Sequence, residues 1–440
     1  MQPENFQDLI LDRPQDGVFG VSRRLFTDPE LFEREMKNIF EGHWIYLAHA
    51  SQLPKAGDYF TTHIGRRSVI LTRNKDGKVG GFLNACAHRG TALCTSERGN
   101  KKYFVCPYHG WVYDADGRNV DVRDRDTGAY PVQFLQRSQD LTAIARLGEY
   151  RGFIFGSLNP DVPPLEKHLG AAMPFIDLLA DQSPQGLEVL KGSATYRYRG
   201  NWKMQAENGI DSYHFPTVHQ NYVMLLQRRA KQQQTGAPGK LRAGFDQRQW
   251  QTDNGCYDLG NGHALLWLTF AAPENRPLWE QREEIMQRVE SARADWMLRR
   301  QRNLLLYPNV QLMDQASTQI RVFRPLSVDL TEVKIYCIAP KGESAAARER
   351  RIRQYEDFFN ASGMATPDDL AVFEAAQIGC AAGASPAQGY ERGMARAAAG
   401  ADAAAAALGV KPVASGPNAQ DETLFHGLYR QWAKLMNGHR

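Results

Sequence analysis

Long apolar runs and a secretion signal are both missing from this chain. No stretch approaches the roughly 18 apolar residues that span a bilayer. The polar, acidic start MQPENFQDLILDRPQD lacks the basic and apolar regions of a signal peptide. Excess charge is missing too, because +4 over 440 residues is too little to indicate binding to nucleic acid or to a membrane surface. We therefore expect a cytoplasmic globular protein of two or three domains.

Cysteine is scarce, and a dinucleotide-binding fingerprint is absent. Six cysteines in a chain of this length do not indicate a disulfide framework, and cytoplasmic thiols stay reduced. No G-x-G-x-x-G follows a predicted strand, so we expect no nicotinamide site in this chain. Most of the cysteines read as small buried residues, but Cys86 and Cys106 stand in short motifs that need another explanation.

The chain changes character along its length. Residues 27–46 have the apolar spacing of an amphipathic helix that begins at Thr27 or Asp28. Residues 55–157 contain short strand-like runs with turn signals at 74–77 and 114–117, which predicts an all-β module. The segment NPDVPP at 159–164 is a natural boundary.

The second half mixes strand and helix patterns and is predicted to be α+β. Strand-like runs include SATYRYRG, HALLWLTF, TQIRVFRPL and EVKIYCIAP, and helix-like runs cover 279–302 and 344–360. The Ala- and Gly-rich stretch 381–407 fits either a helix or a loop. No internal repeat is present.

Two cysteines and two histidines form matched pairs inside the β module. Cys86 and His88 make C-x-H, Cys106 and His109 make C-x-x-H, seventeen residues separate the two motifs, and a glycine follows each. This ligand set serves either zinc or a Rieske [2Fe–2S] cluster. The interleaved order favours the cluster, because each loop then gives one ligand to each iron. The matched loops argue against scattered core residues.

A second histidine pair follows in the α+β half. His214 and His219 are five residues apart, and Asp211 precedes His214 by three. A regular helix would turn the two histidines apart, so a shared metal requires a bend, for which Pro216 supplies a reason. Two histidines and a carboxylate form the facial triad of non-haem iron oxygenases. Taken alone, the pair would favour ordinary surface or core histidines.

The sequence resembles the Rieske non-haem iron oxygenases that hydroxylate aromatic rings. CAHRG…CPYHGW and E-N-x-x-D-x-Y-H-x-x-x-x-H are similar to the two motifs of that family. Residues 27–52, 150–166, 306–315 and 338–370 resemble the large (alpha) subunits of benzoate and anthranilate 1,2-dioxygenases. The resemblance implies an α+β fold in which an all-β Rieske domain (46–158) is inserted between an N-terminal helical segment (1–45) and a helix-plus-antiparallel-sheet catalytic domain (159–440).

The resemblance also assigns roles. It implies that Cys86, His88, Cys106 and His109 hold the cluster, and that His214 and His219 bind a mononuclear iron. Asp369 is implied as the third ligand, although TPDD at 366–369 is also a typical helix start with a threonine cap. Asp211 is implied to bridge a ligand histidine to the Rieske His109 of a neighbouring subunit. Cys94 has no partner cysteine in the second loop and is interpreted as a structural residue.

The implied reaction is dioxygenation of an aromatic acid in aromatic compound degradation. It needs O₂, Fe(II), the cluster, and NADH through a separate FAD/[2Fe–2S] reductase, with a small (beta) subunit in an α3β3 assembly. Benzoate would give a cis-diol carboxylate, and anthranilate would give catechol. Toluates, 2-halobenzoates and anthranilate all remain open, because residues 220–256, Phe215-Pro216 and 393–407 depart from the benzoate pattern.

Three residues are candidates for contact with substrate. Arg321 and Arg324 would lie on opposite faces of a strand, so only one could point inward, and a solvated arginine is the alternative for each. Asn208 stands in the second motif. Three other functions compete: a Rieske monooxygenase or demethylase, a Rieske electron carrier, and a zinc module. The 280 residues after Asn159 and the second histidine pair argue against the electron carrier, the similarity to dioxygenase large subunits argues against the monooxygenase, and metal analysis would decide on the zinc module.

Overall fold

The computed structural model describes residues 5–234, 253–315, 318–383 and 385–438, and these form two compact units. One unit is Met36–Leu165, and the other joins Met1–Glu35 to Glu166–Arg440. The expected α+β architecture, with an all-β module placed inside a helix-and-sheet unit, is confirmed. The exact boundaries at 45/46 and 158/159 stay a prediction.

The unit Met36–Leu165 is built from three small antiparallel sheets. Their strand orders are β6-β5-β4-β7, β10-β9-β8 and β11-β12-β3. The elements are η3 (a π-helix, Met36–Phe40), β3 (Ile45–His49), β4 (Asp58–Ile64), β5 (Arg67–Arg73), β6 (Val79–Leu83), β7 (Arg98–Asn100), β8 (Phe104–Val105), β9 (Val112–Tyr113), β10 (Asn119–Asp121), α3 (Val132–Leu135), β11 (Arg146–Tyr150) and β12 (Phe153–Ser157).

Both predicted turns of this unit are confirmed. Gly77 and Gly117 adopt positive φ angles of 79° and 76°, and each donates its backbone N–H to the first residue of its turn, Asn74 or Asp114. Asn74 Nδ2 also donates to Asp116 Oδ1 at 2.7 Å, which ties one turn to the other. This links the β5–β6 and β9–β10 hairpins at their turns; β6 precedes the first Cys/His loop and β9 follows the second.

The other unit is organised around one large antiparallel sheet. Its order is β13-β20-β19-β18-β17-β16-β15-β23-β22, with β14 also paired to β20. The strands are β13 (Leu187–Val189), β14 (Ala194–Tyr198), β15 (Asn254–Gly260), β16 (His263–Thr269), β17 (Arg300–Leu306), β18 (Val310–Asp314), β19 (Thr318–Ser327), β20 (Leu330–Pro340), β22 (Ala398–Ala399) and β23 (Ala414–Gly416). A small sheet, β1 (Ile10–Arg13), β2 (Val18–Ser22) and β21 (Ala387–Gly389), accompanies it.

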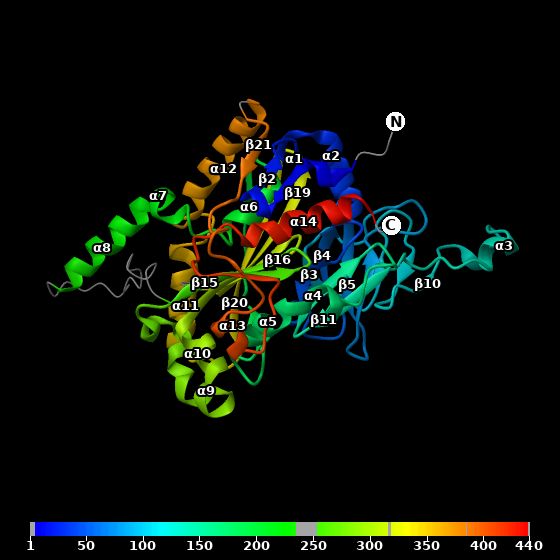
Figure 1. Ribbon diagram of the computed structural model, residues 1–440. Helices are drawn as coiled ribbons and strands as arrows, with labels where there is room; N and C mark the ends of the chain where they lie inside the picture. Colours follow the sequence, from blue (N-terminus) through cyan, green and yellow to red (C-terminus); the bar gives the residue numbers. More distant parts are fainter. Residues whose placement is uncertain (1–4, 235–252, 316–317, 384, 439–440) are drawn as a thin grey trace. The chain divides into compact units, whose positions relative to one another are not determined.

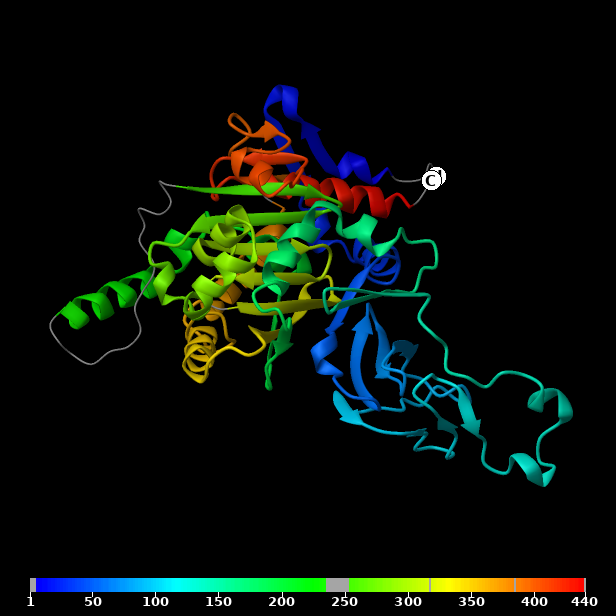
Figure 2. The same ribbon diagram turned by 90° about the horizontal axis from the view of Figure 1, so that it is seen from below.

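Helices cover this sheet, as Figures 1 and 2 show. Helix α14 packs on β15 and β16, and the α7–α8 segment extends outward from the sheet in both views. The helices are α1 (Arg24–Thr27), α2 (Pro29–Glu35), α4 (Leu165–Leu169), α5 (Met173–Ala180), α6 (Trp202–Asn208), α7 (Phe215–Val218), α8 (Gln220–Gln234), α9 (Arg282–Arg288), α10 (Ser291–Arg299), α11 (Ala345–Asp357), α12 (Thr366–Ala381), α13 (Ala403–Ala407) and α14 (Leu424–Met436). No helix in the described ranges is both long and apolar enough to cross a membrane.

Several predicted elements have different limits in the structure. The helix expected over 27–46 is wrong in its second half, because the α-helical geometry ends at Glu35, a π-helical turn follows, and Ile45 begins β3. Asp28 does cap α2, accepting the N–H of Glu30 at 2.9 Å. The helix expected over 279–302 is two helices, and strand β17 begins at Arg300. The helix expected over 344–360 is confirmed as α11, and 381–407 holds short strands and α13.

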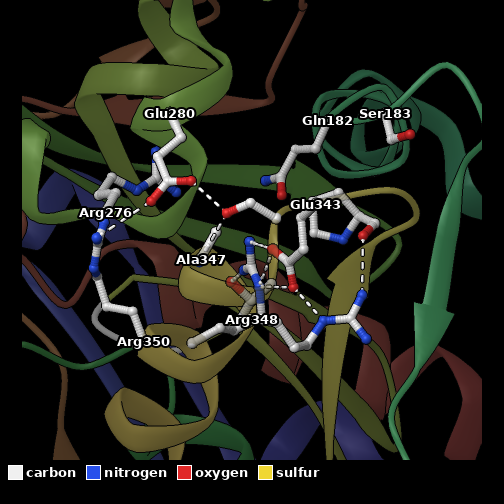
Figure 3. Close-up of polar contacts among 12 residues, drawn as sticks. Gln182, Ser183, Arg276, Glu280, Glu343, Ala347, Arg348 and Arg350 are labelled. Carbon is white, nitrogen blue, oxygen red and sulfur yellow. Dashed lines mark hydrogen bonds and ion pairs between the residues drawn. The ribbon is translucent and has the colours of Figure 1, made fainter.

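A network of charged side chains holds the start of α11 (Figure 3). Ser344 caps the helix by accepting the N–H of Ala347 at 3.0 Å, and its hydroxyl donates to Glu280. The Glu343 carboxylate, 1% exposed, accepts from Arg348 and from Arg351 Nη2 at 2.8 Å. Phe358 and Phe359, which follow the end of α11, belong to a buried cluster with Tyr222, Met313 and Ala365.

A buried ion pair joins three helices of the same unit. Glu35 of α2 and Lys203 of α6 are 1% and 0% exposed and contact each other. The Glu35 carboxylate also accepts the indole N–H of Trp202 at 2.8 Å and of Trp432 in α14 at 2.6 Å, and Lys203 donates to the Leu25 carbonyl at 2.7 Å. Every charge in this cluster is therefore compensated.

We expect Lys203→Met to destabilise this unit by about 3–5 kcal/mol, because it leaves the Glu35 carboxylate buried without its cation. Calorimetric unfolding measures the effect. The double variant with Glu35→Gln should recover part of the loss. Arg197→Met breaks an ion pair whose arginine is 60% exposed and should cost under about 1 kcal/mol. Equal effects of Lys203→Met and Arg197→Met would contradict the assignment.

Candidate metal centres

The Cys/His loops of the unit Met36–Leu165 are two matched turns. Gly90 donates its N–H to the Cys86 carbonyl at 2.8 Å, and Gly110 donates to the Cys106 carbonyl at 3.0 Å. Both glycines have positive φ, 70° and 74°, which explains their place after each ligand pair. The His88 and His109 ring centroids lie 4.6 Å apart, so the loop tips face each other.

The donor atoms at these loop tips fit a metal cluster. Both thiols are buried, and His88 Nδ1 is buried with no hydrogen-bond partner among the described residues. Burial lowers the pKa of His88, which favours the neutral imidazole that a metal binds. Two thiols and two imidazoles, one of each from each loop, are the donor set of a Rieske cluster.

Neighbouring side chains orient the first loop. The Tyr113 hydroxyl lies 3.2 Å from Cys86 Sγ and accepts the N–H of Ala87, while the His88 ring stacks on Trp111 at 4.8 Å. Burial raises the pKa of the Cys86 thiol, and the Tyr113 contact partly opposes this. The sequence offered no signal for Tyr113. Cys94 is a free, buried thiol in the same core, and all six cysteines are free.

The second site is built at a break between helices in the other unit. Helix α6 ends at Asn208, and the four-residue α7 runs from Phe215 to Val218 with Pro216 in its first turn. His214 immediately precedes α7 and His219 immediately follows it. The distortion expected from Pro216 is therefore present. It brings the two imidazoles to a centroid distance of 5.2 Å.

Asp369, from the first turn of α12, completes a group of three donors. Its Oδ1 lies 3.4 Å from His214 Nε2 and 3.2 Å from His219 Nε2, and one ligand atom from each residue lies within 4.8 Å of the others. Donors that sit about 2.1 Å from one metal at right angles are about 3 Å apart, so the spacing fits a facial triad. Asp369 and His219 are buried and His214 is partly buried.

The charges at this site favour a cation. Burial opposes ionisation of Asp369, but its contacts with His214 and His219 outweigh burial and lower its pKa. Burial also disfavours a charged His214, yet Asp211 and Asp369 raise its pKa to about 10. The carboxylates that attract a proton to the rings in this way equally attract a divalent metal, whose binding displaces that proton.

Asp211 and Asn208 orient the donors from either side. Asp211 Oδ2 lies 3.0 Å from His214 Nδ1, on the ring edge opposite the triad, and Asp211 Oδ1 accepts the N–H of Tyr213. Asn208 Nδ2 donates to Asp369 Oδ1 at 3.1 Å and lies 3.2 Å from His214 Nε2. Asp211 therefore fixes the orientation of the His214 ring, and Asn208 contacts two of the three donor atoms, Asp369 Oδ1 and His214 Nε2.

The TPDD segment begins α12 as expected, with Pro367 and both acids in its first turn, but the expected threonine cap is wrong. Thr366 starts α12 but makes no capping hydrogen bond, and its hydroxyl donates instead to the Phe359 carbonyl at 3.1 Å.

The two candidate arginines differ in their burial and in their partners. Arg321 is 2% exposed and points inward, whereas Arg324 pairs with Glu332 at 2.9 Å and is 28% exposed.

Aromatic side chains lie next to His219. The Phe215 and Phe358 rings are 5.1 and 6.0 Å from its imidazole, and Phe358 packs on Tyr222 and Phe359. Phe215 belongs to the pair that departs from the benzoate pattern. Of the divergent segment 220–256, residues 235–252 lie outside the described residues.

The role of Glu207, the partly buried first residue of the second motif, was not anticipated from the sequence. Glu207 accepts hydrogen bonds from the hydroxyls of Tyr429 and Tyr390. Burial raises its pKa to about 7, the two tyrosines partly oppose this, and the charge of Asp211 adds to it. Because its partners come from residues about 180 and 220 positions later, no local pattern could indicate this cluster.

Comparison with known proteins places both sites in known domains. Residues 43–136 match the Rieske [2Fe-2S] domain, and residues 188–438 match the ring hydroxylating alpha subunit (catalytic domain). The chain is 48% identical to toluate 1,2-dioxygenase subunit alpha of Pseudomonas putida, over 97% of this chain and 93% of that protein. It is 47% identical to the 2-halobenzoate 1,2-dioxygenase large subunit of Burkholderia cepacia, over 97% and 91%.

A third relative and a solved structure show the same similarity to aromatic-ring dioxygenases. The anthranilate 1,2-dioxygenase large subunit of Acinetobacter baylyi is 42% identical over 98% of this chain and 93% of its own. The crystal structure of naphthalene 1,2-dioxygenase from Rhodococcus sp., bound to indole, superposes with a TM-score of 0.82 at 26% identity, covering 98% of this chain and 97% of that one.

Glu207 predicts a pH dependence of stability. Its folded pKa of about 7 lies above the ordinary glutamate pKa of 4.5, so its contribution to stability is fully present below pH 4.5 and is lost as the pH rises through 7. Relative to Glu207→Gln, which cannot ionise, the wild type should therefore lose stability between pH 5 and 8. Melting temperatures of both proteins across this range measure it. A difference that stays constant with pH would rule out the raised pKa.

Proposed function

Because the chain belongs to the family of ring-hydroxylating oxygenase alpha subunits, we propose that it is the terminal oxygenase subunit of a 1,2-dioxygenase acting on benzoate or an ortho-substituted benzoate. One observation carries the substrate class. The chain is 42% to 48% identical, over 97% of its length or more, to large subunits whose names specify toluate, 2-halobenzoate and anthranilate.

Members of this family carry a Rieske cluster and a mononuclear iron, and the donors described above fit both. We propose Cys86, His88, Cys106 and His109 as the cluster ligands, and His214, His219 and Asp369 as the iron ligands. When bound, the cluster relays single electrons and the iron activates O₂. The overall reaction adds both oxygen atoms to adjacent ring carbons and consumes two electrons from NADH and two protons.

The side chains of this protein hold the reaction centre in place. Asp211 accepts from His214 Nδ1 and so directs Nε2 toward Asp369. Asn208 donates to Asp369 and fixes that carboxylate. Phe215 and Phe358 line the His219 side with apolar surface, which excludes water from the oxidising centre.

The proposal includes partners. A small subunit and an FAD/[2Fe–2S] reductase are expected because the relatives are parts of multicomponent dioxygenases. We further propose an α3β3 ring in which Asp211 accepts a hydrogen bond from His109 of the adjacent alpha subunit. The Asp211 side chain is 25% exposed, so part of its carboxylate remains accessible to such a donor.

We expect His219→Ala and Asp369→Ala to reduce iron from about three to about two per chain while the Rieske absorption persists. Iron analysis and visible spectroscopy measure this. The matched variant Asp211→Asn removes an orienting group rather than a ligand. It should keep about three irons and lose about 10- to 100-fold in turnover. Full iron content in Asp369→Ala would exclude Asp369 as a ligand.

We expect the chain, copurified with its small subunit and supplied with a reductase and NADH, to take up O₂ with aromatic acids. Benzoate, anthranilate, 2-halobenzoates and toluates are tested separately, and products are identified. A cis-diol acid from benzoate, or catechol from anthranilate or a 2-halobenzoate, supports the proposal. Products with a single added oxygen would instead indicate a monooxygenase, and purification without a small subunit would contradict the assembly.

A further inference from the structure

Arg321 projects from the middle of the large sheet toward the metal site. In β19 it is paired with Gln311 of β18 and Ile335 of β20, and cross-strand partners share a face. Gln311 donates to the carbonyls of Gln205 and Ala206 in α6, so this face is the one that α6 covers. Two residues along β18, on the same face, Met313 packs with Phe358 and Phe359.

The Arg321 guanidinium is buried and pairs with no carboxylate of the described residues. Its exposure is 2%, and Nε and Nη2 have no hydrogen-bond partner among the described residues. Five lysines and arginines in the described ranges are buried, and the other four each pair with a carboxylate: Lys203 with Glu35, Arg276 and Arg302 with Asp314, and Arg351 with Glu343. An unpaired buried charge is costly, which indicates that a ligand supplies the missing anion.

Aromatic rings connect Arg321 to the metal site. The guanidinium carbon lies 5.0 Å from the centroid of the Phe359 ring. The centroids of the Phe359 and Phe358 rings are 4.1 Å apart, and those of the Phe358 and His219 rings are 6.0 Å apart. Burial raises the pKa of the Tyr196 hydroxyl to about 12, with the charge of Arg321 opposing and that of Asp369 adding to the shift. The charges of Arg321 and Asp369 therefore both act on the Tyr196 hydroxyl.

We propose that Arg321 is the receptor for the carboxylate of the aromatic acid substrate, an inference that rests on the proposed function. A planar guanidinium matches a carboxylate with two parallel N–H donors, and here it does so away from water. The Phe359 ring holds the guanidinium from one side. With the carboxylate at Arg321, the substrate ring packs toward Phe358 and His219, and this selects which ring carbons face the iron.

The test compares Arg321→Gln with Arg324→Gln in the purified oxygenase component, using calorimetric binding of benzoate and of benzyl alcohol, its neutral analogue. Arg324 lies on the same strand but on the opposite face, paired with Glu332. Arg321→Gln should weaken benzoate binding by about 30-fold or more and leave benzyl alcohol binding within about twofold. Arg324→Gln should change neither by more than about twofold. Arg321→Lys, which keeps the charge but loses the planar fork, should lie between.

A second measurement separates recognition from folding. Arg321→Gln removes a charge without a carboxylate partner, so without ligand its melting temperature should equal or exceed that of the wild type, and benzoate should no longer raise it. If Arg321→Gln fails to fold, Arg321→Lys carries the comparison. Unchanged benzoate affinity in the variants, with the wild type binding benzoate, overturns the role of Arg321 and leaves the proposed function standing. A wild type that converts neutral arenes but binds none of the aromatic acids overturns both.

Discussion

The contact between the Asp369 carboxylate and the two imidazoles of His214 and His219 is the constraint on which the catalytic unit depends. A buried carboxylate is tolerated only where positive charge or hydrogen-bond donors surround it, so α12 must begin where the histidines converge. The histidines converge because the four-residue helix α7, with Pro216 in its first turn, lies between them. Local backbone irregularity is thus the condition for the site, and the regular sheet beneath it supplies the rigidity.

The sequence predicted the site residues that stand in short motifs and left open those that depend on long-range contacts. The His214–His219 spacing and Pro216 indicated a bent segment, as found. The role of Asp369 could not be derived locally, because an acid in the first turn of a helix also stabilises the helix dipole. The strand pattern separated Arg321 from Arg324 by face, but only the position of Glu332 on β20 shows which of them is paired.

The fold was predicted at the level of elements, and its errors have a common physical cause. Apolar periodicity continues from 27 through 46 and from 279 through 302, yet in each case the helix gives way to a strand whose inward residues are also apolar. Burial of Trp44 and Ile45 satisfies either pattern, so hydrogen bonding to the neighbouring strand decides. The turns were easier to predict, because glycine readily adopts the positive φ angles found at Gly77 and Gly117.

Charge balance explains why a free cation belongs beside this metal site. If Fe(II) binds as proposed, the metal and the Asp369 and Asp211 carboxylates would form a neutral group, and a benzoate anion entering beside it would leave one uncompensated negative charge in a buried region. In the proposed role, Arg321 would cancel that charge, and before substrate enters, the Phe359 ring lies against its guanidinium. The cost of leaving it unpaired is relieved when an anion binds. A neutral arene gains nothing of this kind, so the same residue would favour aromatic acids over hydrocarbons of equal shape.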